Sequence, residues 1–123
     1  MTGYVQVYTG NGKGKTTAAI GLAIRAAGAG MRIFIGQFIK MGDYSEIQAL
    51  KRFSDRIAVE QFGKGRFMDE APEPEDIESA RRGLAAISQA IDSGRYDMVI
   101  LDEANVAVKY GLIEVAALEK LIV

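Results

Sequence analysis

The sequence predicts an α/β domain in which a doubly wound, mostly parallel sheet carries helices on both faces. Two observations predict this class. Short strand-like segments alternate with helical patterns along the chain, and a glycine-rich loop joins the first of these segments to the first helical run. With 123 residues the chain is expected to form one domain.

The strands are predicted from runs of apolar, mostly β-branched or aromatic residues at 4–8, 32–37, 57–61 and 98–101. The first helix is predicted from Thr17 to about Ala27, where alanine and glycine permit close packing on the sheet. Arg25 is the one charge within that helix, and a solvated side chain and a substrate contact both remain open for it.

The clearest helix is predicted from Pro74 to Ser93. Proline suits a first helical position, Glu75 and Asp76 suit the positive end of a helix, and Gly94 suits its stop. Apolar residues recur within it at steps of three and four, which predicts a buried stripe without a functional role: Ile77, Ala80, Leu84, Ile87 and Ile91.

The composition excludes several kinds of chemistry. Fifteen basic and sixteen acidic residues give a net charge of −1 without a long basic block, so no nucleic-acid partner is expected. Without cysteine or histidine, the chain has no disulfide, no thiolate zinc site and no imidazole base. No signal peptide precedes the first strand, and the uncharged run 16–24 is far shorter than the roughly 20 residues that cross a bilayer. A cytoplasmic protein without a membrane partner is expected.

Residues 9–16 read Thr-Gly-Asn-Gly-Lys-Gly-Lys-Thr between the first strand and the first helix, which predicts a phosphate-binding P-loop. Backbone N–H groups would surround phosphate oxygens, with the positive end of the helix dipole behind them. Lys15 would reach the terminal phosphates, and the Thr16 hydroxyl would bind Mg²⁺. Thr9 stands where the general pattern has glycine, so Gly10 and Gly12 are expected to supply the flexibility. The expected fold is therefore P-loop NTPase-like, of the RecA-like kind.

A second motif supports the first. The segment 96–103 is a short apolar strand that ends in two acids, Asp102 and Glu103. In P-loop domains such a strand is expected to lie buried beside the P-loop strand, with its acids facing the Mg²⁺. Two loops, 37–46 and 63–70, follow strands where α/β sheets place ligands, and each could equally be a plain surface connection.

Taken together, residues 8–19, Arg25, residues 37–40 with Gly42 and Glu46, and residues 101–103 resemble the ATP:corrinoid adenosyltransferases. This family attaches the 5′-deoxyadenosyl group of ATP to cobalt in making coenzyme B12. Thr9 in place of glycine is the family's own form of the P-loop, and the resemblance covers nearly the whole chain.

The resemblance implies that ATP lies across the P-loop in the reverse sense to ordinary NTPases. The cobalt(I) of a reduced corrinoid then attacks the 5′-carbon and expels triphosphate. It also implies Mg²⁺ (or Mn²⁺), a flavoprotein as the source of electrons, and a homodimer. The family continues into further strands, so the single nucleotide-binding domain at 1–123 is expected to lack its C-terminal strands.

Residue by residue, the resemblance implies that Lys15 and Glu103 are catalytic and that Thr16 and Glu103 bind the metal, with Asp102 as a second ligand to the metal or an orienting group. The segment 65–68 matches the family's corrinoid-facing segment loosely, because it has no tryptophan. Residues expected to contact ATP or corrinoid are Thr9, Gly10, Asn11, Gly12, Lys13, Gly14, Lys15, Thr16, Thr17, Arg25, Lys40, Arg66, Phe67 and Met68.

Two other functions stay open on the residues alone. An ordinary P-loop ATPase or small-molecule kinase would use Glu103 to orient a water or hydroxyl for attack on the γ-phosphorus. A non-catalytic module would bind ATP only to order its loops. The reaction products would separate these functions from an alkyl transfer.

Overall fold

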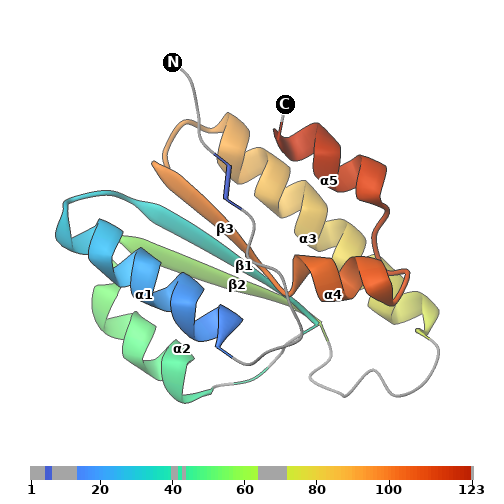
Figure 1. Ribbon diagram of the computed structural model, residues 1–123, viewed down its shortest axis with the longest axis horizontal. Coiled ribbons are helices and arrows are strands. Elements are labelled where there is room, and N and C mark those ends of the chain that lie inside the picture. Colours follow the sequence, from blue (N-terminus) through green and yellow to red (C-terminus); the bar gives the residue numbers. More distant parts are fainter. Residues whose placement is uncertain (1–4, 7–13, 40–41, 43, 64–71, 123) are drawn as a thin grey trace.

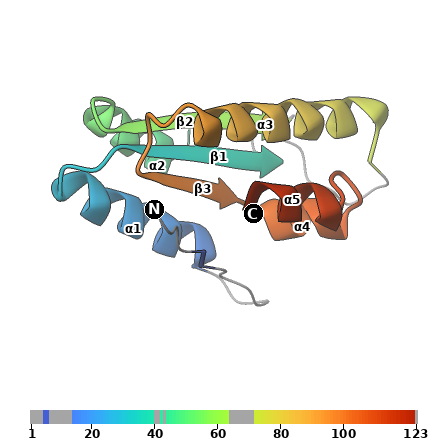
Figure 2. The same ribbon diagram turned by 90° about the horizontal axis from the view of Figure 1, so that it is seen from above.

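A three-stranded parallel sheet forms the centre of the protein, with strand order β2-β1-β3. The computed structural model describes residues 5–6, 14–39, 42, 44–63 and 72–122. Two helices cover one face of the sheet and three cover the other (Figures 1 and 2). The elements in chain order are α1 (Lys15–Gly28), β1 (Ile33–Ile39), α2 (Ser45–Leu50), a 3₁₀ turn (Lys51–Phe53), β2 (Ile57–Gly63), α3 (Pro74–Asp92), β3 (Met98–Asp102), α4 (Ala104–Lys109) and α5 (Val115–Ile122).

The α/β class, the parallel sheet and three of the four predicted strands are confirmed. β1 and β2 run two residues beyond their predicted ends, because the ladder between them continues to the pair Ile39 and Gly63. Of the strand predicted at 4–8, the structure describes Val5 and Gln6, and neither lies in a strand, so the prediction is wrong for these two residues. The rest of that segment lies outside the described residues. Within them, β3 pairs with β1.

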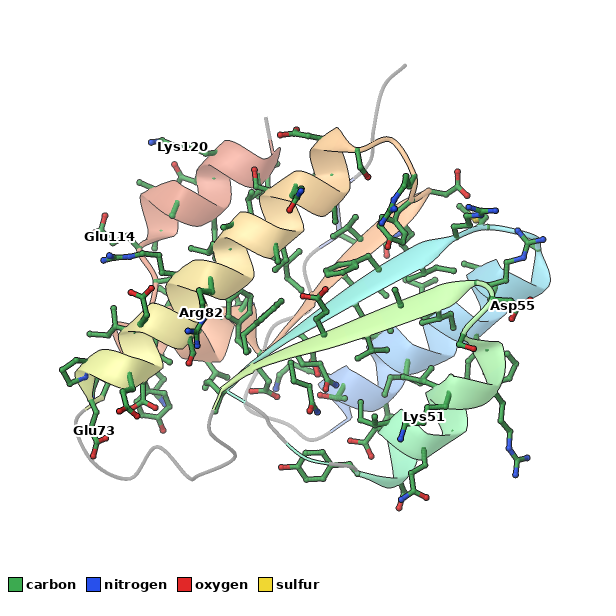
Figure 3. All side chains as sticks on the ribbon, turned by 180° about the vertical axis from the view of Figure 1, so that it is seen from behind. Lys51, Asp55, Glu73, Arg82, Glu114 and Lys120 are labelled. Carbon is green, nitrogen blue, oxygen red and sulfur yellow. The ribbon has the colours of Figure 1, made fainter. Side chains whose placement is uncertain are left out.

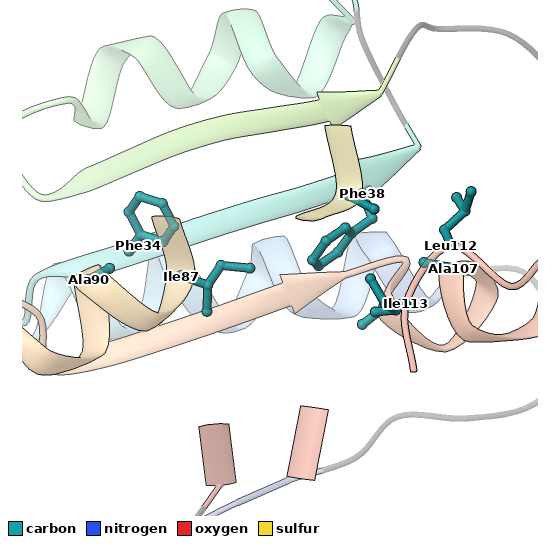
Figure 4. Packing of buried hydrophobic residues seen from close by; sticks show 9 residues of the cluster. Phe34, Phe38, Ile87, Ala90, Ala107, Leu112 and Ile113 are labelled. Carbon is teal, nitrogen blue, oxygen red and sulfur yellow. The ribbon is translucent and has the colours of Figure 1, made fainter. Parts of the chain in front are cut away.

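Each face of the sheet has its own core. On the face covered by α1 and α2, Ile33 and Ile35 of β1 pack with Ala23 and Ala26 of α1 and with Leu50. The opposite face carries Phe34 and Phe38 of β1, which lie beneath α3 and α4 together with Ile87, Ala90, Ala107, Leu112 and Ile113 (Figure 4). β1 supplies both cores because it is the central strand, and successive side chains of a strand point to opposite faces.

The sequence signals at the two ends of α3 are confirmed. The helix begins at Pro74, and the Asp76 carboxylate accepts a hydrogen bond from the backbone N–H of Glu73 at 2.8 Å. It ends at Asp92, one residue before the predicted end. Gly94 follows with φ +70°, a left-handed conformation that glycine adopts without strain.

The predicted apolar stripe of α3 is confirmed for Ala80 and Ile87, which are buried, and Ile77 and Leu84 pack partly buried against the same core. It is wrong for Ile91, which is 40% exposed, whereas Ala90 is buried. Neighbouring residues of a helix are turned by about 100° from each other, so only one of the two can face the sheet.

Two glycines let α3 approach the sheet closely. A Cβ added at Gly83 would lie 2.6 Å from ring atoms of Phe62, and one at Gly36 would lie 3.0 Å from the Cδ1 atom of Ile87. Both contacts are shorter than packed carbon atoms tolerate. The helix therefore packs its own backbone against the aromatic ring of β2.

Many charged side chains lie on the outside of these layers, whereas Asp76 and Asp102 are buried. Figure 3 shows this for labelled residues that are all exposed, among them Lys51, Glu73, Glu114 and Lys120. Within the part of the chain that the structure describes, none of the helices combines the length and the apolar character needed to span a membrane.

Candidate functional site

A layer of polar side chains crosses the sheet at the carboxyl ends of its strands. On the face toward α1, each strand carries two apolar residues and then a polar one, in register with its neighbours. The polar residues are Gln61 of β2, Gln37 of β1 and Asp102 of β3. The apolar residues before them are Ile57 and Val59, Ile33 and Ile35, and Met98 and Ile100.

Hydrogen bonds join this polar layer into a chain that ends on Asp102. The Gln37 amide donates through Nε2 to Asp102 Oδ2 at 3.2 Å, and its Oε1 accepts from Gln61 Nε2 at 3.1 Å. Gln61 Oε1 in turn accepts the backbone N–H of Gly42 at 3.0 Å. Gln37 is fully buried and Asp102 is 7% exposed. In each of these three hydrogen bonds, the donor points along the series in the direction of the Asp102 carboxylate.

Helix α1 brings the end of the P-loop motif to the same carboxylate. Gly14 precedes the helix in the left-handed conformation, with φ 104°, and Lys15 is the first helical residue. The Thr16 hydroxyl donates to Asp102, with Oγ1 at 3.0 Å from Oδ1 and 3.1 Å from Oδ2. Thr16 and Asp102, 86 positions apart in sequence, are thus in direct contact.

The backbone turns sharply beside this contact. Glu103, which follows Asp102, has φ 62° and precedes α4, and Ile39 at the end of β1 has φ 72°. Among the described residues these are the two non-glycine residues with positive φ. A positive φ costs free energy in any residue that has a Cβ atom. Residues with such strained backbones cluster at functional sites in proteins.

The residues in contact suit a hard divalent cation. A hydroxyl that donates its proton to a carboxylate keeps its oxygen lone pairs for a metal, and Mg²⁺ prefers such oxygen ligands. In the described ranges, no three acidic residues gather as a metal-binding group. A site here would rest on Thr16, Asp102 and the phosphates of a nucleotide, with Glu103 as the nearest further carboxylate in sequence.

Two further predicted contact residues that the structure describes, Thr17 and Arg25, lie on α1. Arg25 is exposed near the far end of α1, a helix of 14 residues and hence about 21 Å long. Thr17 is exposed on the first turn. Their roles, and those of Lys15 and Glu103, stay predictions. Outside the described residues lie Thr9, Gly10, Asn11, Gly12, Lys13, Lys40, Arg66, Phe67 and Met68.

Sequence reasoning missed the roles that Gln37 and Gln61 have in this layer. Gln37 is both the last residue of the predicted strand 32–37 and the first of the predicted loop 37–46, whereas the structure places it inside the central strand, fully buried. One signal was available in the sequence. All three strands show the same spacing of two alternate apolar residues followed by an amide or a carboxylate.

A hollow of about 190 Å³ lies at the opposite, amino ends of the strands, beside Arg32, Arg56 and Arg95. Arg56 donates to the backbone oxygen of Gly30 at 3.1 Å, just beyond the end of α1, and Arg95 lies 5.5 Å from the ring centre of Tyr96. Cations at such a position complement the negative ends of the neighbouring helices. The arginines therefore have structural contacts and are remote from Asp102.

Fold and site together define a parallel α/β domain with buried polar groups at the carboxyl edge, compatible with a P-loop-like fold. The model of the family described as ATP:corrinoid adenosyltransferase BtuR/CobO/CobP matches residues 1–123, and the chain belongs to this family.

Individual relatives agree with this assignment. A protein of Pseudomonas aeruginosa named corrinoid adenosyltransferase is 33% identical over 113 residues, which are 91% of this chain and 56% of the relative. Proteins of the same name from Sinorhizobium and Escherichia coli K12 are 34% and 33% identical, over 93% and 88% of this chain. The matches take in 54% and 55% of those two relatives, so the chain spans about half the length of the curated relatives it matches.

Proposed function

We propose that this chain forms the nucleotide-binding part of an enzyme that transfers the 5′-deoxyadenosyl group of ATP to the cobalt(I) of a reduced corrinoid. Cobalt supplies the electron pair of the new carbon–cobalt bond, and the bond from the 5′-carbon to oxygen breaks to release triphosphate. The observation that carries the proposal is the contact between Thr16 and Asp102. In a P-loop domain that contact lies where the metal and the phosphates of a nucleotide meet.

Each residue at this end of the sheet has a role in the proposal. Lys15, at the start of α1, neutralises charge that develops on the departing triphosphate. Thr16 and Asp102 hold the divalent cation, Mg²⁺ or Mn²⁺, which would neutralise the same charge. Glu103 is a further candidate ligand, because it follows Asp102 on the left-handed turn into α4.

The proposal extends to the second substrate and to the partners. The corrinoid would approach the carboxyl edge, where the loops after β1 and β2 leave the sheet. A flavoprotein would supply the electron that brings cobalt to the cobalt(I) state, and the enzyme would act as a homodimer in the cytoplasm. These points rest on the resemblance to the family.

An anaerobic assay with ATP, Mg²⁺ and chemically reduced cobalamin tests the reaction. The assay follows the loss of cobalt(I) absorption and identifies the phosphate product. Light-sensitive adenosylcobalamin together with triphosphate is expected. Phosphate or ADP without a cobalt–carbon bond would overturn the proposal in favour of an ATPase or kinase, and ATP binding without turnover would favour a binding module.

Substitution of Lys15 tests the placement of the phosphates. Lys15→Ala is expected to weaken triphosphate binding and to lower adenosylation by about 100-fold or more, because the stabilised charge develops on the leaving group. The fold should persist, since Lys15 is only half-buried at the first position of α1. Far-ultraviolet circular dichroism checks the fold, and wild-type activity in this variant would contradict the placement.

A further inference from the structure

The amide groups of Gln37 and Gln61 add no apolar contacts to the hydrophobic core. Their strands already carry isoleucine and valine on the same face, one layer before the amides. A buried amide loses free energy relative to an apolar residue unless its hydrogen bonds are made, and these two are satisfied largely by each other and by Asp102. Such a polar layer is favourable when it holds a functional group in place.

The direction of the hydrogen bonds shows which group is held. The backbone N–H of Gly42 can only donate, so Gln61 must present its oxygen to Gly42 and its NH₂ to Gln37. Gln37 then presents its oxygen to Gln61 and its NH₂ to Asp102. The backbone donor at one end thus fixes both amide orientations, and the chain ends on the carboxylate.

Asp102 is consequently held from two sides. Thr16 of α1 donates to both of its oxygens, and Gln37 of β1 donates to Oδ2. A carboxylate that accepts two fixed donors cannot rotate freely about its last side-chain bond. The groups that hydrogen-bond to a metal-binding carboxylate set its direction, and their loss typically weakens metal binding by about ten- to hundredfold.

We propose that Gln37 and Gln61 are positioning residues that aim the Asp102 carboxylate at the nucleotide-bound cation and couple it to the backbone at Gly42. The proposal rests on the nucleotide site of the proposed function and deepens it. Gly42 belongs to the connection between β1 and α2, which leaves the carboxyl edge of the sheet. Binding of the metal-nucleotide complex at Asp102 therefore restrains the backbone at Gly42, and displacement of Gly42 loosens the carboxylate.

Three variants separate positioning from packing. Gln37→Met keeps about the size of the side chain and removes the N–H donor to Asp102 without adding a charge. Gln61→Met removes the link to Gly42 and leaves the contact between Gln37 and Asp102 in place. Glu60→Met is the matched control, because Glu60 is the preceding residue of β2, exposed and on the opposite face.

The first readout is the affinity for ATP with and without Mg²⁺, measured by calorimetry on each folded variant. The gain in affinity from Mg²⁺ is expected to fall about tenfold in Gln37→Met and about threefold in Gln61→Met, whereas the affinity for metal-free ATP and all values of Glu60→Met stay unchanged. Equal losses with and without Mg²⁺, or an unchanged Mg²⁺ gain in Gln61→Met, would overturn the proposal. If Gln37→Met fails to fold, Gln61→Met decides alone.

The second readout is hydrogen exchange at the Gly42 amide, followed by NMR. Mg²⁺ with ATP is expected to slow this exchange in the wild type and not in Gln61→Met. Identical slowing in both would overturn the coupling. A wild type that does not bind ATP would overturn the nucleotide site of the proposed function itself, and ATP binding without any Mg²⁺ dependence would overturn the metal site at Asp102. A normal wild type with unaffected variants overturns only the positioning roles.

Discussion

Asp102 is the residue on which the site converges. It is 7% exposed, and it accepts hydrogen bonds from Thr16 and Gln37, which belong to two different elements. A buried carboxylate that loses a donor keeps its desolvation cost without the compensating bond. Substitutions at its donors are therefore expected to act on both stability and ligand binding.

Removal of the Thr16 hydroxyl isolates one of these donors. Thr16→Val keeps the shape of the side chain, and it is expected to lower the free energy of unfolding by about 1–2 kcal/mol and to weaken Mg²⁺-dependent ATP binding at least tenfold. Urea denaturation and calorimetry measure the two effects. Thr16→Ser, which retains the hydroxyl, is the control and should bind like the wild type; equal losses in both variants would show that the hydroxyl is not the active group.

Helix α3 shows how an element is positioned by small residues as much as by large ones. Its buried side includes Ala80, Gly83 and Ala90, and Ile87 is the one large side chain on it with no exposed surface. The absence of a side chain at Gly83 leaves room for the Phe62 ring of β2. The centre of that ring lies 5.6 Å from the centre of the Phe38 ring, in a tilted arrangement. The approach of α3 to the sheet depends on these contacts.

Two isoleucines on α3 provide a matched test of its orientation. Ile87→Ala is expected to lower the free energy of unfolding by about 2–5 kcal/mol, because it opens a cavity against a fully buried site. Ile91→Ala, on the same helix but 40% exposed, should cost about 1 kcal/mol or less. Urea denaturation measures both values, and a larger loss at Ile91 would mean that the helix is turned otherwise.

Two helical glycines should respond in opposite ways to alanine. Gly83→Ala is expected to lower the free energy of unfolding by about 1–2 kcal/mol, since its Cβ would lie 2.6 Å from Phe62. Gly21→Ala in α1, where an added Cβ meets no atom within 4 Å, should raise it by about 0.5–1 kcal/mol through helix propensity. Thermal unfolding of the pair checks the signs; stabilisation by both substitutions would rule out the close approach at Gly83.

At the scale of the whole molecule, the same sheet contributes residues to two hydrophobic cores and to the candidate site. β1 contributes to the core under α1, to the core under α3, and to the polar layer through Gln37. Thr16, Gln37, Gln61 and Asp102 come from four different elements, so the polar layer exists only when these elements are assembled. Ligand binding at Asp102 should therefore stabilise the domain as a unit.

Addition of a nucleotide tests this linkage. With Mg²⁺ and ATP at about 100 times the dissociation constant, the free energy of unfolding is expected to rise by about 2.7 kcal/mol, because the ligand binds the folded state alone. A thermal-shift titration records the rise, with Asp102→Ala as the non-responding control. No shift in the wild type at saturating nucleotide would contradict a nucleotide site in this chain.

Local signals in the sequence were sufficient for the class of fold and for most of the elements. Alternation of strand and helix patterns predicted the parallel sheet, and Pro74 and Gly94 marked the ends of α3 to within one residue. The pairing of Thr16 with Asp102 was also predictable, because both motifs have a fixed local form and both end at the carboxyl edge of the sheet.

The tertiary structure alone decided which side chains face each other across the sheet. Ala90 is buried in place of Ile91, and the Phe62 ring packs directly against Gly83. Both contacts depend on how α3 is rotated and placed on the strands, which the helical period does not specify. The roles of Gln37 and Gln61 depend on strand register, because only the alignment of β2, β1 and β3 places the two amides beside Asp102 in one layer. Local propensity acts within a segment, whereas register and packing arise between segments. The sequence by itself therefore determined most of the elements, and the tertiary structure determined which polar side chains meet at the carboxyl edge of the sheet.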